Sequence, residues 1–238
     1  MQLGKYSAQN VARELTSLGS SQRAKASAWF FKTGKGQYGE GDVFVGVAVP
    51  QQRTIAKKYR DLLLTEIEKL LQDAVHECRL TALIILADRY KKSSEAERDQ
   101  IAKFYLTHLK QVNNWDLVDS SAPYILGEYL QERSRRILYA LARSKNLWER
   151  RIAIVATAAF IKNDEYEDTL KISAMLLKDK EDLLHKATGW MLREVGKRSL
   201  VSEEKFLDRY ASFMPRTMLR YAIEKFPEPK RKAYLAKR

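Results

Sequence analysis

The chain has 238 residues, of which 45% are hydrophobic, and its 43 Lys and Arg exceed its 30 Asp and Glu to give a net charge of +13. This hydrophobic share can bury a core, which excludes global disorder, and the basic excess favours a polyanionic partner such as DNA or RNA. The single cysteine, Cys78, excludes an internal disulfide and a cysteine-cluster metal site, and the three histidines are scattered singly. We therefore expect neither a metal nor a cofactor.

No stretch of the sequence suggests a membrane or an export signal. No apolar run is long enough to span a bilayer, no lipidation motif stands at either end, and the first ten residues lack an apolar signal core. We therefore expect no membrane partner and a location in the cytosol. We further expect the chain to be a monomer in the cytosol or nucleoid of a bacterium.

Residues 33–50, TGKGQYGEGDVFVGVAVP, are rich in glycine and then alternate Val and Phe with smaller residues. Alternation is typical of a strand, but no partner strand is apparent elsewhere, so we expect a long ordered connection between helices. Gly34, Gly36 and Gly39 form a G-x-G-x-x-G motif, which in a dinucleotide site follows a strand and opens a helix. Here a helix precedes the motif and a loop follows it, so we do not interpret it as a dinucleotide site. Lys35 and the loop amides nevertheless suit contact with a phosphate.

Most of the remaining chain carries apolar residues at helical spacing, with few glycines and prolines to interrupt it. The spacing predicts helices over 62–73, 79–92, 150–162 and 185–198. Ser94 and Ser202 are predicted helix starts, and Ser94 has the capping-box acid Glu97 three residues further on. The basic segment 227–238 is predicted to form a terminal helix.

Charged residues recur at intervals of about 35 residues, each followed by an apolar helical run; they are Arg79, Asp116, Arg151, Lys186 and Arg220. This period is typical of paired-helix solenoids, in which each pair buries its apolar face against its neighbours. We therefore predict a single all-α domain over 1–238, a right-handed α-solenoid of HEAT-like helical repeats with one basic concave face. The recurring charges either line that face or are solvated positions on similar helices, and the periodicity favours neither interpretation.

Trp115 and Asp119 are four residues apart in NNWDLVDS, so on a helix they share one face about one turn apart. A carboxylate repels phosphate, so its place beside an aromatic ring in a basic chain suggests chemistry rather than binding alone. Trp148 and Trp190 also lie beside charged residues, and we interpret Trp148, at a helix start, as packing. Each tryptophan alone fits core packing, and Asp119 alone fits a bond to a backbone amide or an arginine. Together these residues favour a nucleic-acid surface with aromatic faces, without identifying a reaction.

Four segments resemble the DNA alkylation repair family of HEAT-like glycosylases, the AlkD type. They are FKTGKGQYGEGD (31–42), NNWDLVD (113–119), WERRIAI (148–154) and GWMLREV (189–195). The similarity extends over nearly the whole chain in repeat length and in the order of the segments.

In that family a tryptophan and an aspartate from one helix, an arginine from the next repeat and a second tryptophan form the active cleft. The resemblance implies the same cleft here, with Trp115, Asp119 and Trp190 as catalytic residues and Arg151 as a DNA-binding residue. An aromatic residue of the N-terminal helix also lines the family cleft. Phe30 corresponds to it, with Trp29 as the alternative in the alignment.

The implied activity is that of a monofunctional DNA glycosylase, which hydrolyses the N-glycosidic bond of cationic N3- or N7-alkylated purines in duplex DNA during base excision repair. Expected lesions are 3-methyladenine and 7-methylguanine. No lysine falls within the three matched segments that carry Trp115, Asp119, Arg151 and Trp190, which favours water over a lysine as the nucleophile. Two other interpretations stay open: a non-catalytic nucleic-acid-binding HEAT-like array, and a protein-interaction scaffold, the commonest use of helical repeats.

Overall fold

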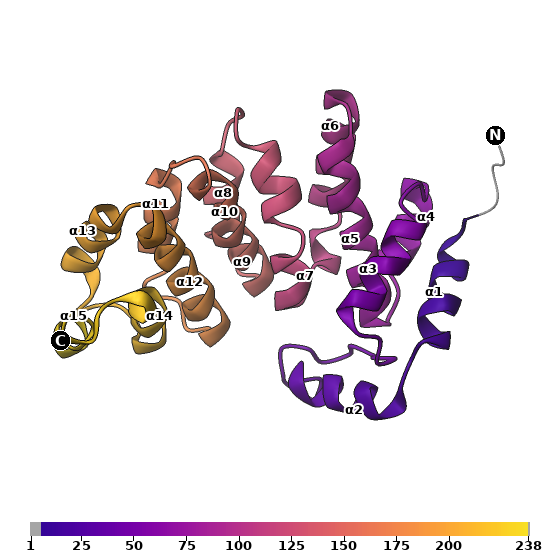
Figure 1. Cartoon of the computed structure of the whole chain (residues 1–238), viewed down its shortest axis with the longest axis horizontal. Coiled ribbons are helices and arrows are strands. Elements are labelled where there is room, and N and C mark those ends of the chain that lie inside the picture. Colours follow the sequence, from indigo (N-terminus) through magenta and orange to yellow (C-terminus); the bar gives the residue numbers. More distant parts are fainter. Residues whose placement is uncertain (1–5, 238) are drawn as a thin grey trace. The chain divides into compact units, whose positions relative to one another are not determined.

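The computed structural model of the chain describes residues 6–237, which are largely helical (Figure 1). Within these residues the β-structure is limited to one isolated parallel bridge, between Val43 and Val75. The predicted all-α class is therefore confirmed. None of the helices in residues 6–237 is both long enough and apolar enough to cross a bilayer. Residues 1–5, where no signal core was expected, and Arg238 lie outside the described part.

The chain divides into two compact units, Met1–Ser121 and Ala122–Arg238, and each buries its own set of apolar side chains. The expectation of a single domain over 1–238 stays a prediction.

The first unit contains α1 (Ala8–Ser17), α2 (Ser21–Phe30), α3 (Val49–Lys58), α4 (Leu64–Leu71), α5 (His76–Lys92), α6 (Glu95–Thr107), the 3-10 turn η1 (Leu109–Gln111) and α7 (Trp115–Asp119). Helix α5 forms its centre and packs against α3, α4, α6 and α7. Its residues 76–86 are all buried, because it is apolar over most of its circumference. The predicted helices 62–73 and 79–92 correspond to α4 and α5, and Ser94 caps α6 with the predicted capping box.

The long connection between α2 and α3 is ordered, as predicted for residues 33–50. The Glu77 carboxylate at the start of α5 accepts hydrogen bonds from three consecutive backbone N–H groups, those of Val45, Gly46 and Val47, at 3.2, 2.7 and 3.3 Å. One step earlier, His76 N donates to the Val43 carbonyl at 2.8 Å. Buried N–H groups must find acceptors, so this carboxylate takes the place of a partner strand.

Helix α2 differs from its neighbours because none of its residues is buried. It ends in two exposed aromatic residues, with 74% of Trp29 and 55% of Phe30 accessible to solvent. The helix is fastened to the loop through Arg23, whose Nε donates to the Gly46 carbonyl at 2.8 Å. The position of α2 therefore depends on the loop that Glu77 holds.

The second unit contains the π-helical turn η2 (Pro123–Gly127), α8 (Arg136–Leu141), α9 (Leu147–Ala156), α10 (Ala158–Ile161), α11 (Glu167–Met175), α12 (Asp182–Arg198), α13 (Leu200–Tyr210), α14 (Arg216–Ala222), the 3-10 turn η3 (Ile223–Lys225) and α15 (Glu228–Ala236). Helix α12 is its centre and packs against α9, α13 and α14. The predicted helix 185–198 is confirmed as α12, and the predicted terminal helix as α15.

Two sequence predictions for the second unit are wrong in detail. The predicted helix 150–162 is divided into α9 and α10 at Thr157, whose buried hydroxyl donates to the Ile154 carbonyl at 2.7 Å and competes with the helical ladder. Ser202 does not start a helix. The N-cap of α13 is Ser199, whose Oγ accepts from Ser202 N at 3.3 Å.

Of the recurring arginines, Arg79 and Arg151 are buried, whereas Arg220 is exposed. Arg79 binds backbone carbonyls of the turn before its helix, and Arg150, the neighbour of Arg151, does the same. Nη1 of Arg79 donates to the carbonyls of residues 73 and 74 at 2.9 and 3.3 Å, and Nη1 of Arg150 donates to those of 144 and 145 at 2.9 and 3.0 Å. In both cases the carbonyls lie six and five residues before the arginine. Each arginine thus fixes the turn that precedes its own helix. For Arg79 and Arg151, which are both buried, the solvated-face interpretation is wrong.

The close contact between α12 and α14 at Gly189 predicts a stability defect. A Cβ at Gly189 would lie 2.4 Å from the Met218 carbonyl oxygen and 2.6 Å from Tyr221 Cβ. Gly189→Ala should therefore lower the free energy of unfolding by about 1–3 kcal/mol in urea titration, despite the better helix propensity of alanine. Gly34→Ala is the matched control, because an added Cβ there meets only the Gln37 side chain. An equal effect of the two substitutions would contradict the prediction.

Candidate active site

The candidate site in the first unit is built on α7, which Trp115 begins and Asp119 ends. Both side chains are partly exposed, so neither is committed to the core. Behind α7 lies Tyr105, whose hydroxyl is 3.0 Å from Ser121 Oγ. Burial raises the pKa of the Tyr105 phenol, and the negative charge of Asp119 adds to the rise, so Tyr105 is neutral at every physiological pH. α7 therefore presents an indole and a carboxylate one turn apart.

Trp115 is the outer member of an aromatic stack that continues into the unit. Its ring lies parallel to Phe31, at 5.3 Å between centroids and 10° between planes. Phe31 in turn stacks on Phe44 at 5.0 Å, and Phe44 stacks on His76 at 4.6 Å. Phe30 meets the edge of Trp115 at 6.0 Å. The indole is thus supported from behind by rings from the loop and from α5, an arrangement that fixes its plane.

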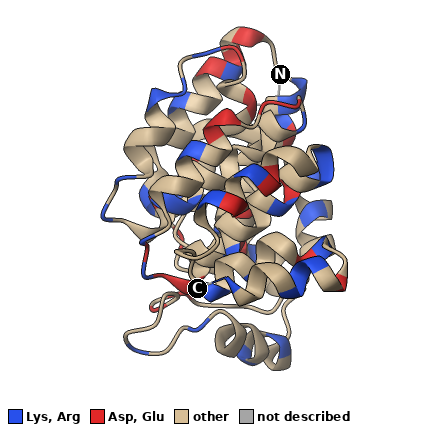
Figure 2. Ribbon diagram, turned by 90° about the vertical axis from the view of Figure 1, so that its left-hand side faces the viewer, with Lys and Arg blue, Asp and Glu red and all other residues tan. Residues whose placement is uncertain are grey.

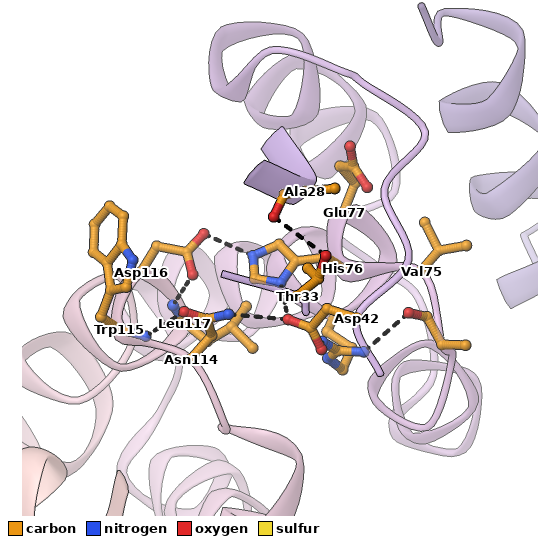
Figure 3. Close-up of polar contacts among 12 residues, drawn as sticks. Ala28, Thr33, Asp42, Val75, His76, Glu77, Asn114, Trp115, Asp116 and Leu117 are labelled. Carbon is orange, nitrogen blue, oxygen red and sulfur yellow. Dashed lines mark hydrogen bonds and ion pairs between the residues drawn. The ribbon is translucent and has the colours of Figure 1, made fainter. Parts of the chain in front are cut away.

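The innermost ring of this stack, His76, bridges two carboxylates (Figure 3). Its Nδ1 lies 2.9 Å from Asp42 Oδ2, and its Nε2 lies 2.8 Å from Asp116 Oδ2. Asp42 also accepts hydrogen bonds from Arg79 and, at 3.0 Å, from Asn114 Nδ2. We refer to these five residues as the His76 network. It joins the loop, α5 and α7.

The charges of the His76 network shift two pKa values. Burial by itself would lower the pKa of His76, but the hydrogen bonds to Asp116 and Asp42 outweigh it and raise the pKa to about 8. Burial opposes ionisation of Asp42, yet the hydrogen bond from His76 and the charge of Arg79 bring its pKa below the ordinary value. At neutral pH the network therefore contains a protonated imidazole and an ionised Asp42.

The same network fixes the first turn of α7. Asn114, which donates to Asp42, also caps the helix by accepting from Trp115 N at 2.8 Å. Asp116, which binds His76 through Oδ2, accepts from Leu117 N through Oδ1 at 2.9 Å. Trp115 thus lies between two residues that are both tied to the network (Figure 3).

The other two predicted site residues lie in the second unit. Trp190, on α12, is partly exposed, and its Nε1 donates to Glu194 Oε1 at 3.1 Å. Arg151, on α9, is only 5% exposed, and its Nη1 donates to the Leu183 carbonyl at 2.6 Å. Trp148 is buried, in agreement with its interpretation as packing. Convergence of Trp190 and Arg151 with Trp115 and Asp119 in one groove stays a prediction.

Lys35 is exposed in the loop, where its side chain can reach a phosphate. The loop amides are engaged within the loop itself, because Gly34 N donates to Gln37 Oε1 at 3.0 Å and Gly36 N donates to Glu40 Oε2 at 2.7 Å. The idea that these amides bind an anion is therefore not supported. Basic positions elsewhere on the helices are interspersed with acidic ones (Figure 2), and the single basic concave face stays a prediction.

Cys78 is buried on α5, and burial raises its pKa to about 12, which suits a packing residue and not a nucleophile. Among the side chains of residues 6–237, no three His, Cys, Asp or Glu are grouped in a way that could hold a metal ion.

Sequence reasoning missed the support behind α7. Phe31 opens the segment 31–42 that carries the family resemblance, but the resemblance gives the aromatic role to its neighbour Phe30. His76 was one of three isolated histidines, and Asp42 lay in a loop without periodicity. A usable signal was the pair of acids, Asp42 and Asp116, in two segments that both carry the family resemblance.

The comparison with known proteins identifies the same family that the sequence motifs resemble. Residues 11–226 match the family model described as DNA alkylation repair enzyme. Among solved structures, a predicted DNA alkylation repair enzyme from Enterococcus faecalis is similar with a TM-score of 0.68 and 17% identity, over 88% of this chain and 97% of that one. This likeness confirms the predicted fold class. No curated protein matches the chain.

The His76 network predicts how the stability of the first unit depends on pH. The pKa of His76 is higher in the folded state, about 8, than its ordinary value of 6.5, so its contribution is fully present below pH 6.5 and lost as the pH rises through 8. The lost stability is about 2 kcal/mol for a shift of this size. The lowered pKa of Asp42 acts oppositely: its contribution is present above pH 3.8 and lost as the pH falls through the folded-state value.

Urea titrations at about pH 6, 7, 8 and 9 span the pKa of His76 in the unfolded and in the folded state. The free energy of unfolding should therefore fall from the lowest pH to the highest. In His76→Gln the decline should disappear. A profile that is flat in the wild type, or that declines equally in the variant, would contradict this assignment.

Proposed function

The chain belongs to the DNA alkylation repair enzyme family, and from this premise we propose that it is a monofunctional DNA glycosylase. Its substrates would be cationic N3- and N7-alkylated purines in duplex DNA, with 3-methyladenine and 7-methylguanine as the simplest members. The products would be the free base and an abasic site, the first intermediate of base excision repair.

The observation that carries the proposal is the geometry of α7. It offers a partly exposed indole at one end and a partly exposed carboxylate at the other, with the indole backed by three further rings. A surface made only for DNA binding gains nothing from a carboxylate, which repels phosphate. A carboxylate does help a reaction in which positive charge develops on the sugar.

The proposed reaction needs no general acid to protonate the leaving base. Alkylation at N3 or N7 gives the purine a positive charge, so the base leaves as a neutral molecule and needs no proton from an acid. As the glycosidic bond breaks, the sugar acquires oxocarbenium character. Asp119 would stabilise this charge electrostatically and orient or deprotonate the attacking water. Water then adds to the sugar carbon and the bond to the base is lost.

The two tryptophans would recognise the cationic nucleoside. The face of an indole attracts a cation by roughly 0.5–2 kcal/mol, depending on how far the pair is desolvated. Trp115 suits this role because it is partly exposed and its ring plane is fixed by stacking on Phe31. Trp190 would supply the second aromatic surface, from α12.

Three residues would hold the DNA itself. Arg151, which is only 5% exposed and is fixed by the Leu183 carbonyl, would attract the backbone beside the lesion through its positive charge. Lys35 would make a flexible phosphate contact from the loop. Phe30, exposed and touching the edge of Trp115, would line the entrance to the site.

Asp119→Asn should separate binding from chemistry. The amide keeps the shape of the side chain and removes the negative charge, so release of 7-methylguanine from a methylated duplex should fall about 100-fold or more in single-turnover assays. Affinity for the same duplex should be unchanged or slightly higher, because the repulsion from phosphate is gone.

Asp88→Asn is the matched control, an exposed carboxylate on α5 in the same unit. It should release base like the wild type. Equal release by Asp119→Asn and the wild type would remove Asp119 from the mechanism, and no release by the wild type would leave a non-catalytic DNA-binding array.

Binding to duplex DNA should be strongly salt-dependent. Neutralising about six phosphates lowers affinity about 1,000-fold between roughly 50 and 200 mM salt. Fluorescence anisotropy with a labelled duplex measures this slope, and Lys35→Ala should reduce it by about one phosphate contact. A slope near zero would favour a protein-interaction scaffold instead.

A further inference from the structure

The hydrogen bonds of His76 determine the charge of its ring. An ionised carboxylate can only accept, and a neutral imidazole has one N–H and one acceptor nitrogen. Nδ1 and Nε2 are both bonded to carboxylates, so the two bonds coexist only if the ring carries two protons or one acid is protonated. Arg79 and Asn114 both donate to Asp42, and Asp116 also accepts from a backbone N–H, so each acid has the surroundings of an anion. The ring is therefore an imidazolium.

Loss of that proton would act on α7. A neutral ring would turn a lone pair toward one of the two carboxylates, and repulsion would replace a hydrogen bond. Asp42 is held by Arg79 and Asn114, whereas the side chain of Asp116 is 13% exposed and lies on a helix of five residues. Asp116 is therefore the group that moves, and Trp115 is its neighbour in the chain.

We propose that the protonated His76 is a positioning residue, which holds Trp115, and through α7 also Asp119, in the orientation needed for base release. It touches neither the substrate nor the reacting atoms. The effect on base release rests on the proposed glycosylase function, whereas the effect on the orientation of Trp115 does not.

The two hydrogen bonds of His76 make the orientation of Trp115 sensitive to pH. The charged groups that face the ring are Asp42 from the loop, Arg79 from α5 and Asp116 from α7. Arg79 opposes protonation and the two carboxylates favour it, with a pKa of about 8 as the result. Trp115 is then fixed below this pH and released above it.

The first test observes Trp115 directly by fluorine NMR of the full-length protein labelled with 5-fluorotryptophan. Four tryptophan signals are expected, and Trp115→Phe identifies the relevant one. In the wild type this signal should shift with a midpoint near pH 8. In His76→Gln it should lie at the high-pH position throughout. Asp116→Asn serves as a second variant if His76→Gln does not fold, and it should move the midpoint to lower pH.

His108→Gln is the matched control. Its ring also binds an acid, Glu68 at 3.2 Å, and stacks on an aromatic ring, Phe104 at 4.2 Å, but it caps α6 and has no bond to α7. The Trp115 signal should titrate normally in this variant. A Trp115 signal that does not titrate in the wild type, or that titrates unchanged in His76→Gln and Asp116→Asn, would overturn the proposal.

The second test measures single-turnover release of 7-methylguanine. His76→Gln should slow release about 10- to 100-fold at pH 7, the effect of a small displacement of a catalytic group, with duplex affinity within about twofold. Wild-type release should decline above pH 8, and that limb should be absent in His76→Gln. Normal release by His76→Gln would refute the positioning role and leave the glycosylase proposal standing. If the wild type releases no base, the glycosylase proposal fails, and the NMR titration still decides how Trp115 is held.

Discussion

A buried imidazolium held between two carboxylates is the interaction on which the first unit depends. It joins residues 34 and 40 positions away from His76, and so ties the loop and α7 to the central helix. Away from water such a set of charges is stable only when complete, because removing one partner leaves a buried charge without compensation, at about 3–5 kcal/mol. Arg79 and Asn114 complete it: Arg79 donates to Oδ1 of Asp42, and Asn114 donates to Oδ2, which His76 also binds.

This constraint explains how so short a helix can carry the candidate site. Five residues are far fewer than an isolated helix needs for stability in water. α7 persists because its N-cap and its first acidic residue are both held by the network, while Leu117 and Val118 are buried beneath it. Its outward residues, Trp115 and Asp119, are consequently displayed on a rigid support, as precise chemistry requires.

Several of the helices and the family are predictable from the sequence, since both depend on patterns within short segments. Periodicity located α4, α5 and α12, the basic tail indicated α15, and the motif around Trp115 marked the candidate site. The support of the site was beyond such patterns. Asp42 and Asn114 are 72 residues apart, and nothing local indicates that they meet. The adjacent Arg150 and Arg151 look alike in sequence, yet one binds the preceding turn and Asp179 while the other reaches Leu183.

Helix α2 contributes little buried apolar surface to the stability of the chain. Since none of its residues is buried, its detachment would hydrate little apolar surface beyond what water already reaches. Denaturant acts in proportion to newly exposed area, so such an opening would be nearly indifferent to urea, whereas unfolding of the α5 core responds steeply. Hydrogen exchange of the α2 amides would then report a local opening that is separate from unfolding of the rest of the molecule. Trp29 and Phe30, which belong to α2, would move with the helix.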